Sequence, residues 1–262
     1  MRKLTSFTLV ALVALAVSAC SSSGKEIEQG SEQELYTKGQ SYLQNGDYSQ
    51  AVRYLEAVKN RFPAMSYSEQ TQLGLIYAYY KSQEYTKALS AAEAFLQRYP
   101  NSPNVDYVVY MAGLTNFASG DNFLQDFFGI DRATRDAAAM KAAFANFRTL
   151  VQYFPNSVYA QDSLARMAYI KAALARHELA IAKFYMKRNA YVAVANRVAD
   201  MLRQYPDTQA TLEALPLMKY SYEKMNLVEL AKQTETLIQA NKGKVFEKVS
   251  LPPSSGLENL IK

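Results

Sequence analysis

Four segments of this chain end alike, with an aromatic residue followed by proline: NRFP at 60–63, QRYP at 97–100, QYFP at 152–155 and RQYP at 203–206. Recurring self-similarity is the sequence signature of repeat architectures. Because proline cannot continue a helix, each ending marks the close of a helical unit. The chain is therefore expected to fold as consecutive helical repeats, and an ordinary helical bundle without repeats is the weaker alternative.

Positions at fixed offsets before these prolines hold a small or apolar residue, an aromatic residue and then alanine. This pattern resembles the tetratricopeptide repeat, a pair of helices that pack closely because alanine replaces a larger side chain at their contact. The offsets give Gly39, Tyr42, Ala51 and Leu55 before Pro63, and Ile76, Tyr79, Ala88 and Ala92 before Pro100.

The third repeat contains an insertion. Gly113 and Ala143, which hold the equivalent small positions, are 30 residues apart, whereas the spacing in the first repeat is 12. An insertion of 18 residues therefore separates the two helices. It includes Phe123, Phe127 and Phe128, which make it too apolar for a loop without a contact.

The fourth repeat is expected to contain one long helix. Its first helix is longer by 14 residues than the equivalent helix of the second repeat, which is close to four turns and keeps the same face in register. This predicts a helix over about 157–188, followed by a second helix over 190–206. Either Asp207 or Thr208 is expected to cap the helix that follows.

A fifth helix pair over 210–225 and 227–242 is expected to close the array, because the polar residues Glu229, Lys232, Gln233 and Glu235 suit an outer face. The stretch 243–262 has paired prolines and no repeat pattern, and it is expected to be a flexible tail that docks elsewhere in part. The predicted fold is an all-α tetratricopeptide-repeat solenoid of five helix pairs.

The N-terminus has the three-part layout of a secretion signal over 1–19. Arg2 and Lys3 precede 16 uncharged residues that end just before Cys20. That apolar stretch would reach only about 24 Å as a helix, which is short for a bilayer core of ~30 Å. The residues around Cys20 resemble a bacterial lipoprotein signal, which predicts a lipid on this thiol and a polar tether over 20–31.

Composition excludes several classes of function. Without Arg2 and Lys3 the chain has 27 basic and 24 acidic residues, a balance too mild to indicate nucleic-acid binding. Once Cys20 is lipidated, no cysteine remains for a disulfide, a nucleophile or a metal. No cofactor is therefore expected beyond the covalent lipid.

Catalysis is not expected either. His177 is the only histidine, and it lies inside a predicted helix, so no histidine-based catalytic set can form around it without help from distant residues. No metal-ligand spacing or phosphate-binding loop is present. In the insertion, Asp121, Asp126 and Asp131 stand near Arg132 and Arg135, and ion pairing is the expected use of these carboxylates.

Binding is better supported, because an aromatic row is expected along the first helices of repeats one to three. Tyrosine combines a large contact area with a polar group and a low ordering cost, which suits capture of extended peptides. The alternative for each tyrosine is a place in the core between repeats. The predicted groove residues are Tyr36, Gln40, Tyr77, Tyr80, Lys81, Tyr107, Tyr110 and Leu114.

The chain resembles the BamD (ComL) family of outer-membrane protein assembly lipoproteins over roughly 32–240. The resemblance is carried by the lipoprotein signal and the repeats, together with LIYAYYK at 75–81, FFGIDRATRD at 127–136 and AYVAVANRVADM at 190–201. It implies a location on the periplasmic side of the outer membrane, anchored in the inner leaflet. It also implies membership of the machine that folds β-barrel proteins.

The same resemblance implies three kinds of partner. Repeats over 32–155 would receive the C-terminal signal strand of an unfolded barrel protein, and repeats over 156–242 would dock on a periplasmic POTRA domain of the barrel subunit BamA. BamC-like and BamE-like lipoproteins would bind along the side. The residues expected at the BamA contact are Tyr185, Arg188, Tyr191, Asn196 and Arg197, with Arg197 able to form a bidentate pair with a carboxylate.

Two other classes remain open from the residues alone. A general scaffold of the cell envelope would share the anchor and the repeats but would not need the insertion motif. A receptor for a soluble ligand, or a hydrolase, would need a deep polar pocket, and the scarcity of histidine argues against hydrolysis.

Overall fold

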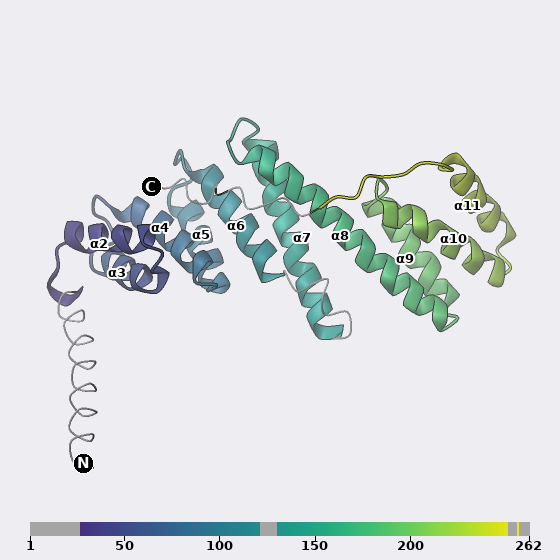
Figure 1. Ribbon diagram of the computed structural model, residues 1–262, viewed down its shortest axis with the longest axis horizontal. Helices are drawn as coiled ribbons and strands as arrows, with labels where there is room; N and C mark the ends of the chain where they lie inside the picture. The colour runs from purple at the N-terminus through teal and green to yellow at the C-terminus, as the bar shows by residue number, and fades with distance from the viewer. Residues whose placement is uncertain (1–26, 121–129, 251–255, 257–262) are drawn as a thin grey trace, which may run out of the picture. The chain divides into compact units, whose positions relative to one another are not determined.

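The computed structural model describes residues 27–120, 130–250 and 256, and within them it is helical without any strand (Figure 1). The helices follow one another in antiparallel pairs, so the predicted all-α repeat fold with five helix pairs is confirmed. The pairs are α2 (Glu32–Gln44) with α3 (Tyr48–Arg61), α4 (Ser68–Lys81) with α5 (Tyr85–Arg98), α6 (Val105–Ser119) with α7 (Ile130–Tyr153), α8 (Ala160–Lys187) with α9 (Tyr191–Gln204), and α10 (Gln209–Lys224) with α11 (Val228–Ala240).

The turns inside the pairs share one backbone feature. A single residue adopts positive φ in four of them: Gly46 at 76°, Gln83 at 62°, Asn189 at 57° and Asn226 at 56°. A left-handed residue just past the helix end lets the following N–H groups bond back to the last carbonyls. The chain therefore reverses within three residues and places the second helix directly against the first.

Small residues permit that close packing. Ala51 and Ala88 are buried, as the repeat pattern predicts. At Gly39 an added Cβ would lie 2.7 Å from the Leu55 side chain, and at Gly113 it would lie 2.5 Å from the ring of Phe147. The tight helix contacts therefore depend on these residue sizes.

Contacts divide the chain into two compact units, with the boundary between Met111 and Ala112 inside α6. This boundary differs from the division at 155 and 156 that the sequence suggests. The second half of α6 belongs to the second unit because it packs on α7 and α8. Asn116 donates a hydrogen bond of 3.0 Å to Asn146, and the ring of Phe117 lies 5.9 Å from that of Tyr169.

The long helix expected in repeat four is α8, with 28 residues. It carries a buried ion pair in which Arg166 Nε donates to Asp162 Oδ2 at 2.6 Å. Of the two candidate caps for the next helix, Thr208 is the one used, because its side chain accepts from the Thr211 N–H. The insertion is partly helical, since α7 begins at Ile130.

Other predictions on the insertion fall outside what the structure describes. These are the contacts of Phe123, Phe127 and Phe128, and the pairing of the carboxylates with Arg132 and Arg135. The signal segment 1–19 and Cys20 also lie outside the described residues, as does the tether apart from its last residues.

Candidate functional site

The first part of the predicted aromatic row lies where α2 meets α4. The ring of Tyr36 stacks on that of Tyr67, with centroids 4.4 Å apart and planes at 17°. Burial raises the pKa of Tyr36, while a hydrogen bond from the Gln40 side chain lowers it and the neighbouring Tyr67 raises it. Tyr36 is half-buried, so its ring offers one face to a ligand while the other is held in place.

Gly74 lies in the middle of the junction between α2 and α4. A Cβ at Gly74 would lie 3.0 Å from Leu55 and 3.5 Å from the amide nitrogen of Gln40. Because glycine has no side chain, α2 and α4 approach closely and Gln40 reaches across the junction. Tyr36 and Gln40 of α2 therefore form one continuous surface with the residues of α4.

A lysine lies beside two tyrosine rings at the end of α4. The Tyr48 and Tyr77 rings meet edge to face with centroids 5.9 Å apart. The Lys81 ammonium lies 5.7 Å from the Tyr48 centroid and 5.9 Å from the Tyr77 centroid. No carboxylate pairs with Lys81 in the part of the chain that the structure describes. Its charge is therefore available for an anionic group, and half-buried Tyr80 flanks the same stretch of α4.

Two predicted groove residues are in the core instead. Tyr107 is 1% exposed and Tyr110 is 0% exposed, so the prediction that they line an accessible groove is wrong. Leu114 is buried in the same way. The reason is that α6 is apolar on all sides, and every residue from 107 to 115 is buried. The row available to a ligand is therefore Tyr36, Gln40, Tyr77, Tyr80 and Lys81, joined by Tyr48 and Tyr67; we call this set the aromatic row.

In the second unit, three of the five predicted docking residues gather at the α8–α9 turn. Tyr185 and Arg188 belong to the end of α8, and Tyr191 begins α9. The Arg188 guanidinium lies 4.4 Å from the Phe184 ring centroid, and Phe184 meets Tyr185 edge to face. These contacts hold the aromatic rings at the turn without removing them from solvent.

The neighbouring α10–α11 turn extends this surface, and sequence reasoning missed its contribution. Tyr191 meets Tyr220 of α10 at 6.1 Å, and Lys224 lies 5.2 Å from the Tyr220 ring centroid. We call this surface the turn patch; it consists of Phe184, Tyr185, Arg188, Tyr191, Val192, Tyr220, Lys224, Leu227 and Val228, of which Phe184, Val192, Tyr220, Leu227 and Val228 are exposed apolar side chains.

The other two predicted docking residues lie further along α9. Asn196 is exposed, and six residues separate Tyr191 from Arg197, about 9 Å along a helix. Arg197 Nη1 donates to Glu178 Oε2 of α8 at 2.7 Å, and these side chains are 33% and 16% exposed. Arg197 is thus engaged inside the chain, so a partner carboxylate would have to compete with Glu178.

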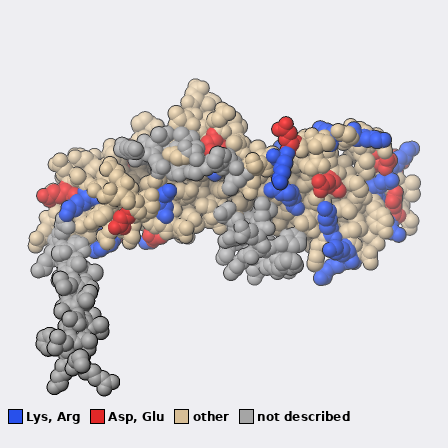
Figure 2. Space-filling model, in the orientation of Figure 1, with Lys and Arg blue, Asp and Glu red and all other residues tan. Residues whose placement is uncertain are grey.

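The charge of the molecule is unevenly divided between the two units. Residues 27–111 carry 7 Lys and Arg against 9 Asp and Glu, whereas residues 112–250 carry 18 against 13. Figure 2 shows several of these basic side chains over one face of the second unit. Two of these cations, Arg188 and Lys224, stand over aromatic rings of the turn patch. The patch therefore suits an acidic partner surface that also offers apolar contact.

Groups suited to chemistry do not assemble among the described residues. His177 is half-buried in α8, and burial lowers its pKa. No set of three or more His, Cys, Asp or Glu side chains is placed to hold a metal within 27–120 and 130–250. In the same residues no helix combines the length and apolar character needed to cross a membrane.

The consecutive helix pairs define a protein of the tetratricopeptide-like repeat class. The family model for YfiO, described as outer membrane lipoprotein, matches residues 28–237, and this chain belongs to that family.

Three relatives align with this chain over most of its length. The chain is 66% identical over 262 residues to a protein of Pasteurella multocida, covering 100% of both chains. It is 58% identical over 258 residues to one of Haemophilus influenzae, covering 98% of each. A Vibrio cholerae protein is 41% identical over 235 residues, which are 89% of this chain and 98% of that protein. Each of the three is named outer membrane protein assembly factor BamD.

Proposed function

We propose that this chain is a non-enzymatic component of the outer-membrane β-barrel assembly complex, where it serves as a binding scaffold. The observation that carries the proposal is its 66% identity, across the whole length, to a protein named as an outer membrane protein assembly factor. The test is to purify the lipidated protein from outer membranes and identify what co-purifies. Recovery of the barrel subunit BamA supports the proposal, and recovery of cell-wall proteins alone favours a general envelope scaffold.

The anchor in this proposal is a lipid on Cys20, which holds the protein on the inner leaflet with its repeats in the periplasm. Two acyl chains are enough for stable attachment to a bilayer. Radiolabelled palmitate should enter the wild-type protein and not the Cys20→Ser variant. A Cys20→Ser protein that still fractionates with the outer membrane would show that the anchor is elsewhere.

The turn patch is the proposed docking surface for a POTRA domain of BamA. It joins exposed aromatic and aliphatic side chains with Arg188 and Lys224 in a basic unit, the combination found in the centre of stable interfaces. Tyr220→Ala is expected to weaken docking of the purified POTRA region by about 10-fold, since one such side chain is worth ~1–2 kcal/mol. Tyr153→Ala is the matched control, because Tyr153 is an exposed tyrosine of the same unit outside the patch.

The aromatic row is the proposed receptor for the C-terminal signal strand of an unfolded barrel protein. Half-buried rings at Tyr36 and Tyr77 can stack on aromatic side chains of an extended peptide. The Lys81 ammonium can pair with the terminal carboxylate. A fluorescent barrel C-terminal peptide should therefore bind more tightly than its amidated form, and Lys81→Met should remove the difference. Equal affinity of both peptides for wild-type protein would place the carboxylate elsewhere.

BamC-like and BamE-like lipoproteins are the remaining proposed partners. The proposal for them rests on the family alone. Co-purification from strains in which Tyr220→Ala replaces the wild-type protein tests whether they reach this chain directly or through BamA.

A further inference from the structure

The chain folds back on itself after α11. Residues 244–250 leave the last helix and run in an extended conformation over the start of α10 towards α8 (Figure 1). The Phe246 N–H donates a hydrogen bond of 3.2 Å to Gln209 Oε1, and the Lys244 ammonium lies 4.8 Å from the Phe246 ring centroid. We call Lys244–Ser250 the strap. The sequence predicted a flexible tail from 243 onward that docks elsewhere in part, and these residues lie along a furrow on the second unit.

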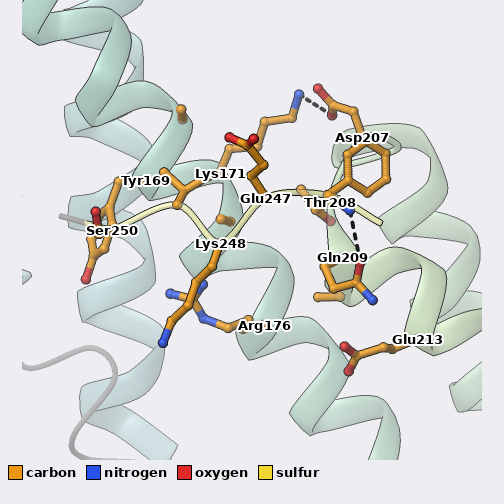
Figure 3. A pocket seen from close by; sticks show the side chains of 15 residues that line it. Tyr169, Lys171, Arg176, Asp207, Thr208, Gln209, Glu213, Glu247, Lys248 and Ser250 are labelled. Atoms are coloured by element: carbon orange, nitrogen blue, oxygen red, sulfur yellow. Dashed lines mark hydrogen bonds and ion pairs between the residues drawn. The ribbon is translucent and has the colours of Figure 1, made fainter. Parts of the chain in front are cut away.

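The furrow is a cleft of about 650 Å³ bounded by α8, the start of α10 and the strap (Figure 3). Three alanines, Ala168, Ala172 and Ala210, line it, and their small side chains leave room for a chain to lie between the helices. Tyr169 lines the α8 side of the cleft. Lys171 of α8 forms an ion pair with Asp207, and this pair ties α8 to the segment before α10 at the edge of the cleft.

The strap forms one wall of this cleft, and two of its side chains are turned towards the helices. Phe246 and Val249 are half-buried, whereas Val245 is 79% exposed and Glu247 and Lys248 are exposed. An aromatic residue and a branched aliphatic residue three positions later thus face the protein. The side chain of Gln209 recognises the strap through a backbone N–H, which any residue except proline can supply.

The attachment is suited to exchange. Within the described residues, the strap makes one hydrogen bond to a helix, from the Phe246 N–H to Gln209 Oε1, and it joins no sheet. The cleft residues lie inside the stretch 28–237 that the outer membrane lipoprotein family shares, whereas the strap lies beyond it.

We propose that the strap is an intramolecular ligand for a groove that binds extended polypeptide. When the strap leaves, the groove takes a segment of another chain that carries an aromatic residue followed three positions later by a branched aliphatic residue. The strap then competes with such a segment for the groove, so only a segment with sufficient affinity can displace it. This inference does not depend on the barrel-assembly role or on the aromatic row.

The absence of tryptophan from the sequence makes the strap easy to observe in the full-length protein. Phe246→Trp introduces a single fluorophore that should emit at short wavelength because its ring lies against the groove. Val245→Trp is the matched control: one residue away and 79% exposed in the wild type, it should emit like the free peptide. Circular dichroism checks that both variants retain the fold.

A synthetic peptide of residues 243–250 is the probe for binding in trans. Its addition should shift the Phe246→Trp emission to longer wavelength with a saturable dependence, and leave the Val245→Trp emission unchanged. A peptide with serine in place of Phe246 and Val249 should be at least 10-fold weaker. Gln209→Ala should weaken strap docking, which hydrogen exchange at the Phe246 amide of otherwise wild-type protein reports without a tryptophan.

Two results would overturn the proposal. If Phe246→Trp emits like the free peptide and the Phe246 amide of the wild type exchanges without protection, the strap does not occupy the groove. If the strap is docked but millimolar peptide changes neither emission nor exchange, the groove does not accept a chain in trans. Either result leaves BamA docking and peptide capture by the aromatic row untouched.

Discussion

Replacing Arg197 with leucine removes one side of the ion pair that joins α9 to α8. The pair is neither fully exposed nor fully buried, with Arg197 33% and Glu178 16% exposed and a distance of 2.7 Å. Exposed pairs contribute about 0.2–1 kcal/mol, and loss of one partner from a buried pair costs ~3–5 kcal/mol. Arg197→Leu is therefore expected to lower stability by about 2 kcal/mol, between these limits.

The assay is a double-mutant cycle on thermal unfolding, followed by circular dichroism. Arg197→Leu should lower the melting temperature of the second unit by roughly 4–8 °C, and Glu178→Gln should lower it less, because it leaves a cation that can turn to water. The free energy of unfolding of the double variant should fall by about 1 kcal/mol less than the sum of the two single losses, because each single variant already breaks the ion pair. Additive losses would refute the argument that the pair stabilises α8 against α9.

The same cycle separates the internal role of Arg197 from a role at the proposed BamA contact. If a partner carboxylate competes with Glu178 for Arg197, Glu178→Gln should strengthen POTRA docking while Arg197→Leu weakens it. If both variants weaken docking in proportion to their loss of stability, Arg197 acts only by holding the two helices together. Arg197→Lys is the control for charge without the planar guanidinium.

Three further outcomes follow from the described contacts. Gly113→Ala should destabilise the second unit by about 1–2 kcal/mol by calorimetry, because the new Cβ meets a buried phenylalanine ring at 2.5 Å; Gly74→Ala, with its nearest contact at 3.0 Å, should be close to neutral. Tyr77→Ala should reduce affinity for a barrel C-terminal peptide about 10-fold with the fold intact, whereas Tyr107→Ala should cost ~3–5 kcal/mol of stability in a melt. Burial lowers the pKa of His177, so between pH 7 and pH 5 the unfolded chain takes up a proton that the folded chain resists, and the melting temperature should fall on acidification; an identical pH profile for His177→Gln would contradict this.

The repeat pattern was sufficient to predict the helices because it records local constraints. Proline ends a helix, alanine permits a close contact, and threonine caps the next helix, each within a few residues of the structure it specifies. The long helix α8 followed from counting turns, and its observed bounds lie within three residues of the predicted range. These features need no knowledge of which other residues lie nearby.

The binding surfaces were predicted less well, because they depend on neighbours far apart in the chain. Offsets from Gly39 carried the groove onto Tyr107 and Tyr110, yet the offsets do not reveal that α6 is covered on every side. Its run of apolar residues was the available signal. The contact of Tyr191 with Tyr220 joins two repeats, and no single repeat contains the information that places them together.

The place where the tail docks was not predicted, for a related reason. Its sequence lacks a repeat and precedes paired prolines, which are features of flexible tails. Docking depends instead on Ala168 and Ala172 of α8 and Ala210 of α10, which line the cleft. An alanine on a helix surface leaves a furrow as well as a close contact, and only the assembled helices show which of the two it makes.

Because the two units differ in charge, long-range electrostatic attraction contributes differently at their surfaces. Near the turn patch, the excess of basic residues acts over about 8–10 Å at physiological salt and favours encounter with acidic partners. The aromatic row lies in a unit with a slight acidic excess, so the proposed peptide would be held there by stacking and by the local charge of Lys81, without help from a wider field. Because the two surfaces draw on different forces, one chain can hold a structured partner and a transient extended segment without the binding of one substituting for the other.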